Sequence, residues 1–101
     1  MLLKGEAIMN NYEIMIVTKI ISDEELNAII EKSKSIINAE GKVDKVDIWG
    51  EKALAYEILG STRGIYALIT YSSTSNTTKE LDRYLKINET ILRHMIVRKE
   101  R

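Results

Sequence analysis

Apolar and polar side chains alternate between residues 12 and 17, which is the period that a pleated β-strand requires. Tyr12, Ile14 and Ile16 share one face of this predicted strand. The opposite face is only partly polar, because it carries Glu13, Met15 and Val17. We therefore expect a strand whose two faces have different roles.

The next segment has the period of a helix. Ser22 stands three residues before Glu25, which is the spacing of a capping box, and the acidic residues after Ser22 suit the positive end of a helix dipole. Gly41 is expected to act as a left-handed stop. We predict a helix over residues 22–40, with an apolar face formed by Leu26, Ile29, Ile30, Ile36 and Ile37.

Two strands joined by a hairpin are predicted after this helix. β-Branched and aromatic residues are frequent in 43–59, where Gly50 marks a bulge or bend. Residues 60–64 are predicted to form the hairpin loop. The segment 65–71 is nearly continuously apolar, so we expect a strand that is buried on both faces or covered by a partner.

Thr77 and Glu80 repeat the capping-box spacing at the start of a shorter helix, and a last strand is predicted at 91–97. This order is that of a ferredoxin-like βαββαβ sandwich, an α+β fold in which a four-stranded antiparallel sheet carries two helices on one face. We expect one domain at 10–101 after a loose tail at 1–9. An apolar surface on the helix-free face of the sheet would mark an interaction site.

The charge of the chain is zero in sum but unevenly distributed. Residues 1–50 carry 6 basic and 9 acidic side chains, whereas residues 51–101 carry 9 basic and 6 acidic ones. The neutral total speaks against binding nucleic acid by bulk electrostatics. A basic corner near the C-terminus could nevertheless contact phosphate. The alternative is that these charges only maintain solubility.

Residue types that support catalysis or metal binding are scarce, since the chain has no Cys and one His. His94 is predicted to lie within a strand, and Asp44 and Asp47 have no third ligand beside them. We therefore expect no enzyme, no cofactor, no metal and no small-molecule substrate. No segment approaches the roughly 20 apolar residues of a membrane helix, so we expect no membrane contact and a cytoplasmic location.

The sequence allows two alternative interpretations of the function. Residues 63–71 are similar to the third strand of an RNA-recognition motif, but Ile65 and Ala67 occupy the positions where that motif has base-stacking aromatic rings. An RNA binder of this kind, acting without a second protein, is one alternative. A small ferredoxin-like enzyme or ligand-binding module is the other, and it would need a pocket with convergent polar groups.

A ten-residue segment in the second predicted strand reads Gly50-Glu51-Lys52-Ala53-Leu54-Ala55-Tyr56-Glu57-Ile58-Leu59. It resembles the signature of the bacterial small-ribosomal-subunit protein six family, which runs Gly-x-Lys, a polar position, Leu-Ala-Tyr-x-Ile and a basic or small residue. The chain departs from that signature at Ala53 and Leu59. The stretches 9–13, 62–66 and 85–97 also agree, so the similarity extends over nearly the whole chain.

The resemblance implies a structural, cytoplasmic component of the small ribosomal subunit. The family binds the central domain of small-subunit rRNA together with ribosomal protein eighteen. On this basis the candidate rRNA contacts are Tyr12, Lys86, Arg93 and His94. The candidate contacts of the protein partner lie along the second predicted strand and are Trp49, Lys52, Leu54 and Tyr56.

Overall fold

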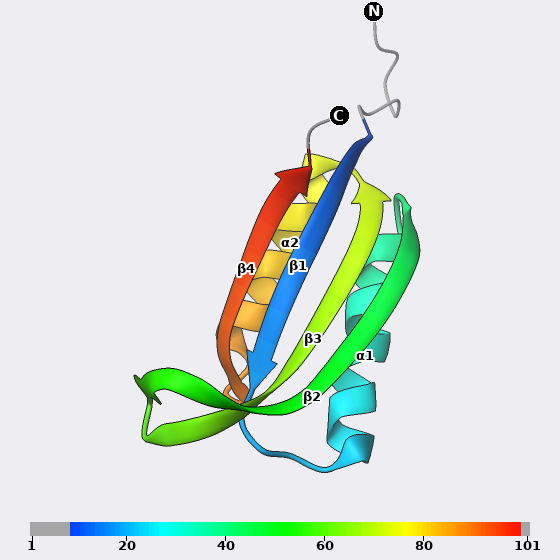
Figure 1. The fold of residues 1–101 in the computed structure, drawn as a ribbon. Coiled ribbons are helices and arrows are strands. Elements are labelled where there is room, and N and C mark those ends of the chain that lie inside the picture. The colour runs from blue at the N-terminus through cyan, green and yellow to red at the C-terminus, as the bar shows by residue number, and fades with distance from the viewer. Residues whose placement is uncertain (1–8, 100–101) are drawn as a thin grey trace, which may run out of the picture.

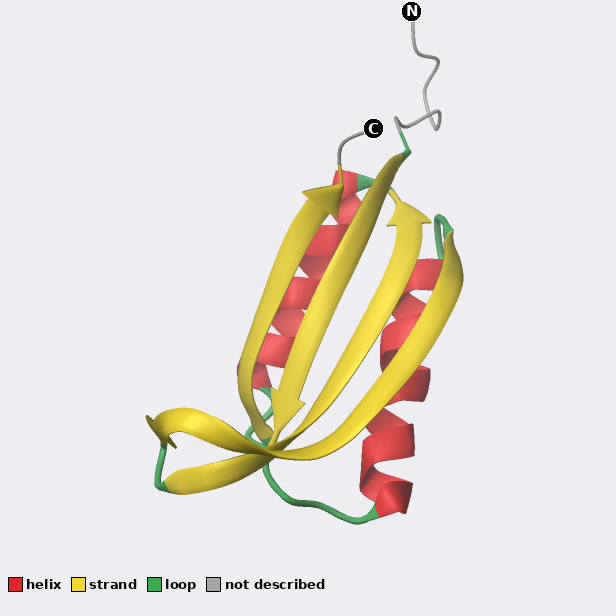
Figure 2. Cartoon of the chain, viewed as in Figure 1, coloured by secondary structure: helices red, strands yellow, loops and turns green. Residues whose placement is uncertain are grey.

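The computed structural model describes residues 9–99, and its elements follow the predicted order (Figure 1). They are β1 (Asn10–Thr18), α1 (Asp23–Asn38), β2 (Lys42–Ile58), β3 (Ser61–Ser73), α2 (Ser75–Ile87) and β4 (Ile91–Lys99). The strands form one antiparallel sheet in the order β2-β3-β1-β4. Both helices cover the same face of this sheet (Figure 2). The ferredoxin-like fold is thus confirmed, whereas residues 1–8 of the predicted tail lie outside the described residues.

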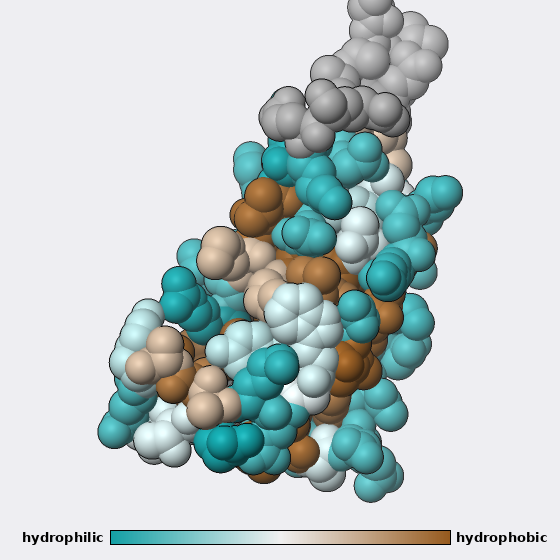
Figure 3. Space-filling model, in the orientation of Figure 1, coloured by the Kyte–Doolittle hydropathy of each residue, from teal (hydrophilic) through white to brown (hydrophobic). Residues whose placement is uncertain are grey.

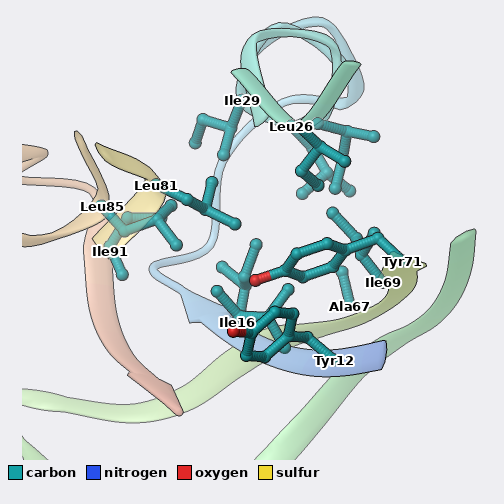
Figure 4. Close-up of a cluster of buried hydrophobic side chains, with 13 residues drawn as sticks. Tyr12, Ile16, Leu26, Ile29, Ala67, Ile69, Tyr71, Leu81, Leu85 and Ile91 are labelled. Carbon is teal, nitrogen blue, oxygen red and sulfur yellow. The ribbon is translucent and has the colours of Figure 1, made fainter. Parts of the chain in front are cut away.

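The core lies between the sheet and the two helices, as Figure 4 shows. The residues of β1 that face the helices are buried, in agreement with the predicted alternation. Tyr71 of β3 stacks on Tyr12 of β1 with ring centroids 5.3 Å apart. The Tyr71 hydroxyl also lies 3.1 Å from that of Thr78 on α2, which ties this helix to the sheet. The other core residues include Ile14, Ile16, Leu26, Ile29, Ala67, Ile69, Leu81, Leu85 and Ile91.

Helix α1 begins as predicted but ends differently. The Ser22 side chain accepts a hydrogen bond from the backbone N–H of Glu25, and the Glu25 carboxylate accepts one from the backbone N–H of Ser22, which completes the capping box. The prediction that Gly41 ends the helix in a left-handed conformation is wrong, because Ala39 ends it in the right-handed conformation and Gly41 has no positive φ. Gly41 is needed for space instead, since a Cβ there would overlap the carbonyl oxygen of Ser72.

The hairpin between β2 and β3 turns at Leu59 and Gly60 rather than across the predicted loop at 60–64. Both turn residues have positive φ, 48° and 81°, which is the geometry of a two-residue turn matched to the twist of the strands. β3 therefore begins at Ser61, and the hairpin projects beyond the ends of β1 and β4 (Figure 1). The predicted bend at Gly50 is confirmed by its φ of 89° and by a register shift beside it.

Helix α2 is capped by Thr74, not by Thr77 as the sequence suggested. The Thr74 hydroxyl oxygen accepts a hydrogen bond from the backbone N–H of Thr77 at 3.2 Å. Both threonine hydroxyls donate to the carboxylate of Glu40, at 2.8 and 3.1 Å. This places a negative charge at the positive end of α2, where the helix dipole stabilises it. Glu80, the expected second member of the capping box, forms an ion pair with Arg83 at 2.9 Å instead.

Candidate RNA and protein interfaces

Three of the four predicted rRNA contacts lie at one end of the domain, where α2 leads into β4. Lys86 is in the last turn of α2, and Arg93 and His94 are near the start of β4. The side-chain Oδ1 of Asn88 accepts hydrogen bonds from the backbone N–H and the hydroxyl of Thr90, at 3.0 and 2.8 Å. This short turn holds the end of the helix close to the start of the strand.

Asp82 of α2 contacts two of these three residues. Its carboxylate lies 2.7 Å from His94 Nε2 and 3.5 Å from Lys86 Nζ. The hydrogen bond from His94 is the main reason why the pKa of Asp82 lies below its usual value; burial opposes this effect and the Lys86 charge adds to it. The His94 side chain is only 14% exposed, whereas that of Lys86 is 72% exposed. Lys86 is therefore the accessible cation of this group.

Arg93 faces the opposite side of the sheet. The pairing of β4 with β1 places His94 opposite Ile16 and Arg93 opposite Val17. Ile16 belongs to the core beneath the helices, and successive residues of a strand face opposite sides, so Arg93 lies on the helix-free face. There its Nη1 donates a hydrogen bond to Tyr56 Oη at 3.0 Å. Arg93 thus contacts a residue that the sequence assigned to the protein partner.

An apolar groove of about 230 Å³ lies on this helix-free face. Regular pairing between β2 and β3 is interrupted between Ala53 and Ile58, and the intervening residues approach β1 and β4. Figure 3 shows that apolar side chains interrupt the polar surface of this face. The sequence predicted an apolar surface here, and the groove lies within it. Its apolar lining includes Met15, Val17, Leu54, Tyr66 and Met95.

The four predicted contacts of the protein partner do not form a single cluster. Leu54 and Tyr56 both line the groove, and Tyr56 is 62% exposed. Trp49 is located at a register shift of β2, outside the groove, and is 45% exposed. Lys52 is exposed further along the same strand. The four predicted partner contacts therefore extend along β2, and only the last two, Leu54 and Tyr56, lie in the groove.

Tyr12 does not belong to the accessible surface. It is 6% exposed, and its ring packs on Tyr71 inside the core. The alternation in β1 already placed Tyr12 on the core face, and this packing overrides its assignment to rRNA. We therefore remove it from the candidate RNA interface.

Sequence reasoning missed Asp82 and two residues of the groove, Tyr66 and Met95. The spacing of four residues between Asp82 and Lys86 on one helix was a usable signal for their contact. No comparable signal existed for the groove, because its walls come from three separate strands and from the irregular part of β2.

The rest of the described chain offers little further chemistry. A larger hollow of about 870 Å³ lies between α1 and α2 and shares no lining residue with the groove. Among residues 9–99, no three His, Asp or Glu side chains are grouped to hold a metal ion. None of the helices in this range is long and apolar enough to cross a membrane.

Comparison with known proteins defines the class of the chain. Residues 11–98 match the family model described as Ribosomal protein S6. Small ribosomal subunit protein bS6 of Clostridioides difficile is 49% identical over 90 residues, which cover 88% of this chain and 98% of that protein. The bS6 protein of Alkaliphilus metalliredigens is 48% identical over 91 residues, with coverage of 89% and 97%. The crystal structure of 30S ribosomal protein S6 from Thermotoga maritima aligns with a TM-score of 0.84 at 28% identity and covers 91% of this chain and 89% of that one.

The sandwich fold and these matches describe a structural protein of the ribosome rather than an enzyme. Within that class, the chain belongs to the ribosomal protein S6 family. The resemblance at residues 50–59 is therefore confirmed, and the alternative of a small ferredoxin-like enzyme is set aside. The relatives of this chain are proteins of the small ribosomal subunit, in agreement with the cytoplasmic, ribosomal location that the resemblance implied.

Proposed function

We propose that this protein binds the central domain of small-subunit rRNA together with ribosomal protein eighteen. Family membership supports this function, and the observation that carries it is the position of two exposed cations. Lys86 and Arg93 flank the short turn between α2 and β4, and both are solvent-exposed. Lys86 lies on the helix side of the sheet and Arg93 on the helix-free face, so RNA that follows this end of the sandwich can place a phosphate against each.

The proposal explains why a protein of zero net charge can act on RNA. Electrostatic affinity for RNA grows with the number of phosphate contacts, and this end of the domain supplies few of them. An apolar groove on the helix-free face is left uncovered in the free protein. A protein partner seated there would bury this surface and add its own RNA contacts, so that each protein favours the binding of the other.

The residues are assigned accordingly. Lys86 and Arg93 contact rRNA, whereas the enclosed His94 supports this surface through its hydrogen bond to Asp82. The protein partner is contacted by Trp49, Lys52, Leu54 and Tyr56.

Charge reversal tests the RNA assignment. Lys86→Glu combined with Arg93→Glu should weaken binding of the heterodimer to a central-domain rRNA fragment in a filter assay. The magnitude of the slope of log affinity against log salt should fall by about one for each lost phosphate contact. Lys79→Glu is the matched control, because Lys79 is exposed on the same helix nearer its start. Unchanged affinity and slope in the double variant would contradict the assignment.

Removal of the indole tests the partner assignment. Trp49→Ala should weaken association with ribosomal protein eighteen about tenfold in titration calorimetry, since exposed aromatic residues are frequent anchors of protein interfaces. Ile20→Ala is the control, because Ile20 is 53% exposed in the segment between β1 and α1. Equal affinities for the two variants would show that the partner binds another surface.

A further inference from the structure

One hydrogen bond joins the two surfaces that the proposed function separates. Arg93, assigned to rRNA, donates from Nη1 to the hydroxyl oxygen of Tyr56, assigned to the protein partner, at 3.0 Å. The two residues are 37 positions apart in sequence and lie on β4 and β2, which are the edge strands of the sheet. This contact exists because the irregular stretch of β2 crosses towards β4.

The irregular stretch itself has an unusual geometry. Ala53 pairs with Arg63 and Ile58 pairs with Ser61, so four residues of β2 are opposite the single residue Thr62. These four residues leave the regular ladder, and three of them, Leu54, Ala55 and Tyr56, line the groove on the helix-free face. Tyr56 is among them, and its position depends on side-chain contacts rather than on regular strand pairing.

Arg93 also lacks a competing charge. Within residues 9–99 no carboxylate forms an ion pair with its guanidinium, whereas Lys86 shares Asp82 and Arg83 is paired with Glu80. A guanidinium has five N–H donors, so the contact with Tyr56 leaves others free for a phosphate. Tyr56 therefore orients the group without neutralising it.

The exposure of Tyr56 makes this orientation sensitive to a partner. In the free protein 62% of Tyr56 is exposed, so water competes for the hydroxyl and the side chain of Arg93 keeps much of its freedom. A protein that packs on the Tyr56 ring excludes this water and lowers the local dielectric, which strengthens the hydrogen bond. The guanidinium would then be held in place before RNA arrives.

We propose that Tyr56 is a positioning residue through which binding of the protein partner orients Arg93 for rRNA. This inference rests on the proposed function, since it requires both binding events. The energetic link is reciprocal, so RNA must raise the affinity for the protein partner by the same factor that the partner raises the affinity for RNA.

The test measures this coupling factor. The affinity of the protein for a central-domain rRNA fragment is determined by filter binding at one salt concentration, with and without saturating ribosomal protein eighteen. The ratio of the two affinities, corrected for RNA binding by the partner alone, gives the coupling. Tyr56→Phe keeps the ring and removes the hydroxyl, so it should reduce the coupling about fivefold.

Tyr66→Phe is the matched control, because it makes the same chemical change in the same groove without removing a hydrogen bond to Arg93. It should keep the coupling of the unmodified protein. If Tyr56→Phe shows the same coupling as the unmodified protein, Tyr56 does not position Arg93 and the inference fails alone. If the unmodified protein shows no coupling, the proposed joint function fails as well.

Discussion

Two glycines of this fold are required for different physical reasons, and paired substitutions separate the two. A Cβ on Gly41, between α1 and β2, would overlap the carbonyl oxygen of Ser72 and come within 2.7 Å of the Ser73 side chain. Gly60 has a φ of 81°, and a Cβ on it would meet no atom within 4 Å. The requirement at Gly41 is therefore one of space, and the requirement at Gly60 is one of backbone conformation.

The expected losses of stability follow from this difference. At Gly60, alanine should lower the free energy of unfolding by about 1–2 kcal/mol, the cost of a left-handed backbone for an ordinary residue. Asparagine should cost less there, because it adopts that conformation more readily. At Gly41 the obstacle is the backbone of Ser72, which is paired with Lys42 in the β2–β3 ladder and cannot move alone. Alanine should cost about 3 kcal/mol, the upper part of the range for overpacking, and the larger asparagine no less.

Urea unfolding followed by far-ultraviolet circular dichroism would measure all four variants. A domain of this size is expected to unfold in one step, so the midpoints at a common slope give the differences in free energy. The comparison of alanine with asparagine at each position is the decisive result: asparagine should cost less stability than alanine at Gly60 but not at Gly41. If asparagine is also the milder replacement at Gly41, that glycine acts as a left-handed stop and the close approach to Ser72 is not what requires it.

Two further predictions concern stability. The pKa of Asp82 lies below its usual value, so its carboxylate stabilises the fold above the usual pKa, and this effect is lost as the pH falls through the lower pKa of the folded state. Asp82→Asn should lower the free energy of unfolding by less than about 1 kcal/mol at pH 7, since the carboxylate is partly exposed. The difference from the unmodified protein should shrink in acid, and a difference that stays the same there would contradict this explanation. Leu59→Asn should raise the free energy of unfolding by about 1 kcal/mol, because Leu59 has positive φ and is 76% exposed; a lower urea midpoint than that of the unmodified protein would disprove this.

The fold could be predicted from the sequence where the decisive contacts are local or periodic. The capping box of Ser22 and Glu25 joins residues three positions apart, and it forms as predicted. The alternation in β1 required only that one face of the strand be buried, and the sheet satisfies it. The order of the six elements then restricted the topology to a small number of sandwiches.

Local patterns failed where a distant residue decides between similar candidates. Both Thr74 and Thr77 are suitable helix caps, and the carboxylate of Glu40, at the end of the other helix, binds both hydroxyls and holds Thr74 at the cap. The hairpin turn was misplaced because leucine is a rare residue at positive φ, so Leu59 gave no turn signal. Residues 61–64 of the predicted loop belong to β3 instead, and there Arg63 forms an ion pair with Glu51 at 2.6 Å.

The interfaces were less predictable than the fold, because a residue type does not say which way a side chain faces. Tyr12 was chosen for rRNA on family resemblance, yet strand alternation placed it on the same face as Ile14 and Ile16, and that face is the buried one. Arg93 and His94 are neighbours in sequence and seemed to form one basic group. In the sheet they face opposite sides, so each has different neighbours, Tyr56 for the first and Asp82 for the second.

This division changes the meaning of the neutral charge. On the helix side of β4 a single carboxylate, that of Asp82, lies within reach of both Lys86 and His94 and offsets part of the Lys86 charge. On the helix-free side Arg93 is held by a neutral hydroxyl and keeps its full charge. Of the proposed contacts, Arg93 should therefore have the larger share of the affinity for phosphate, although it lines the apolar groove and does not share a face with Lys86 and His94. A protein that covers this groove must approach Arg93 closely, and for this reason RNA binding and partner binding are expected to depend on each other in this domain.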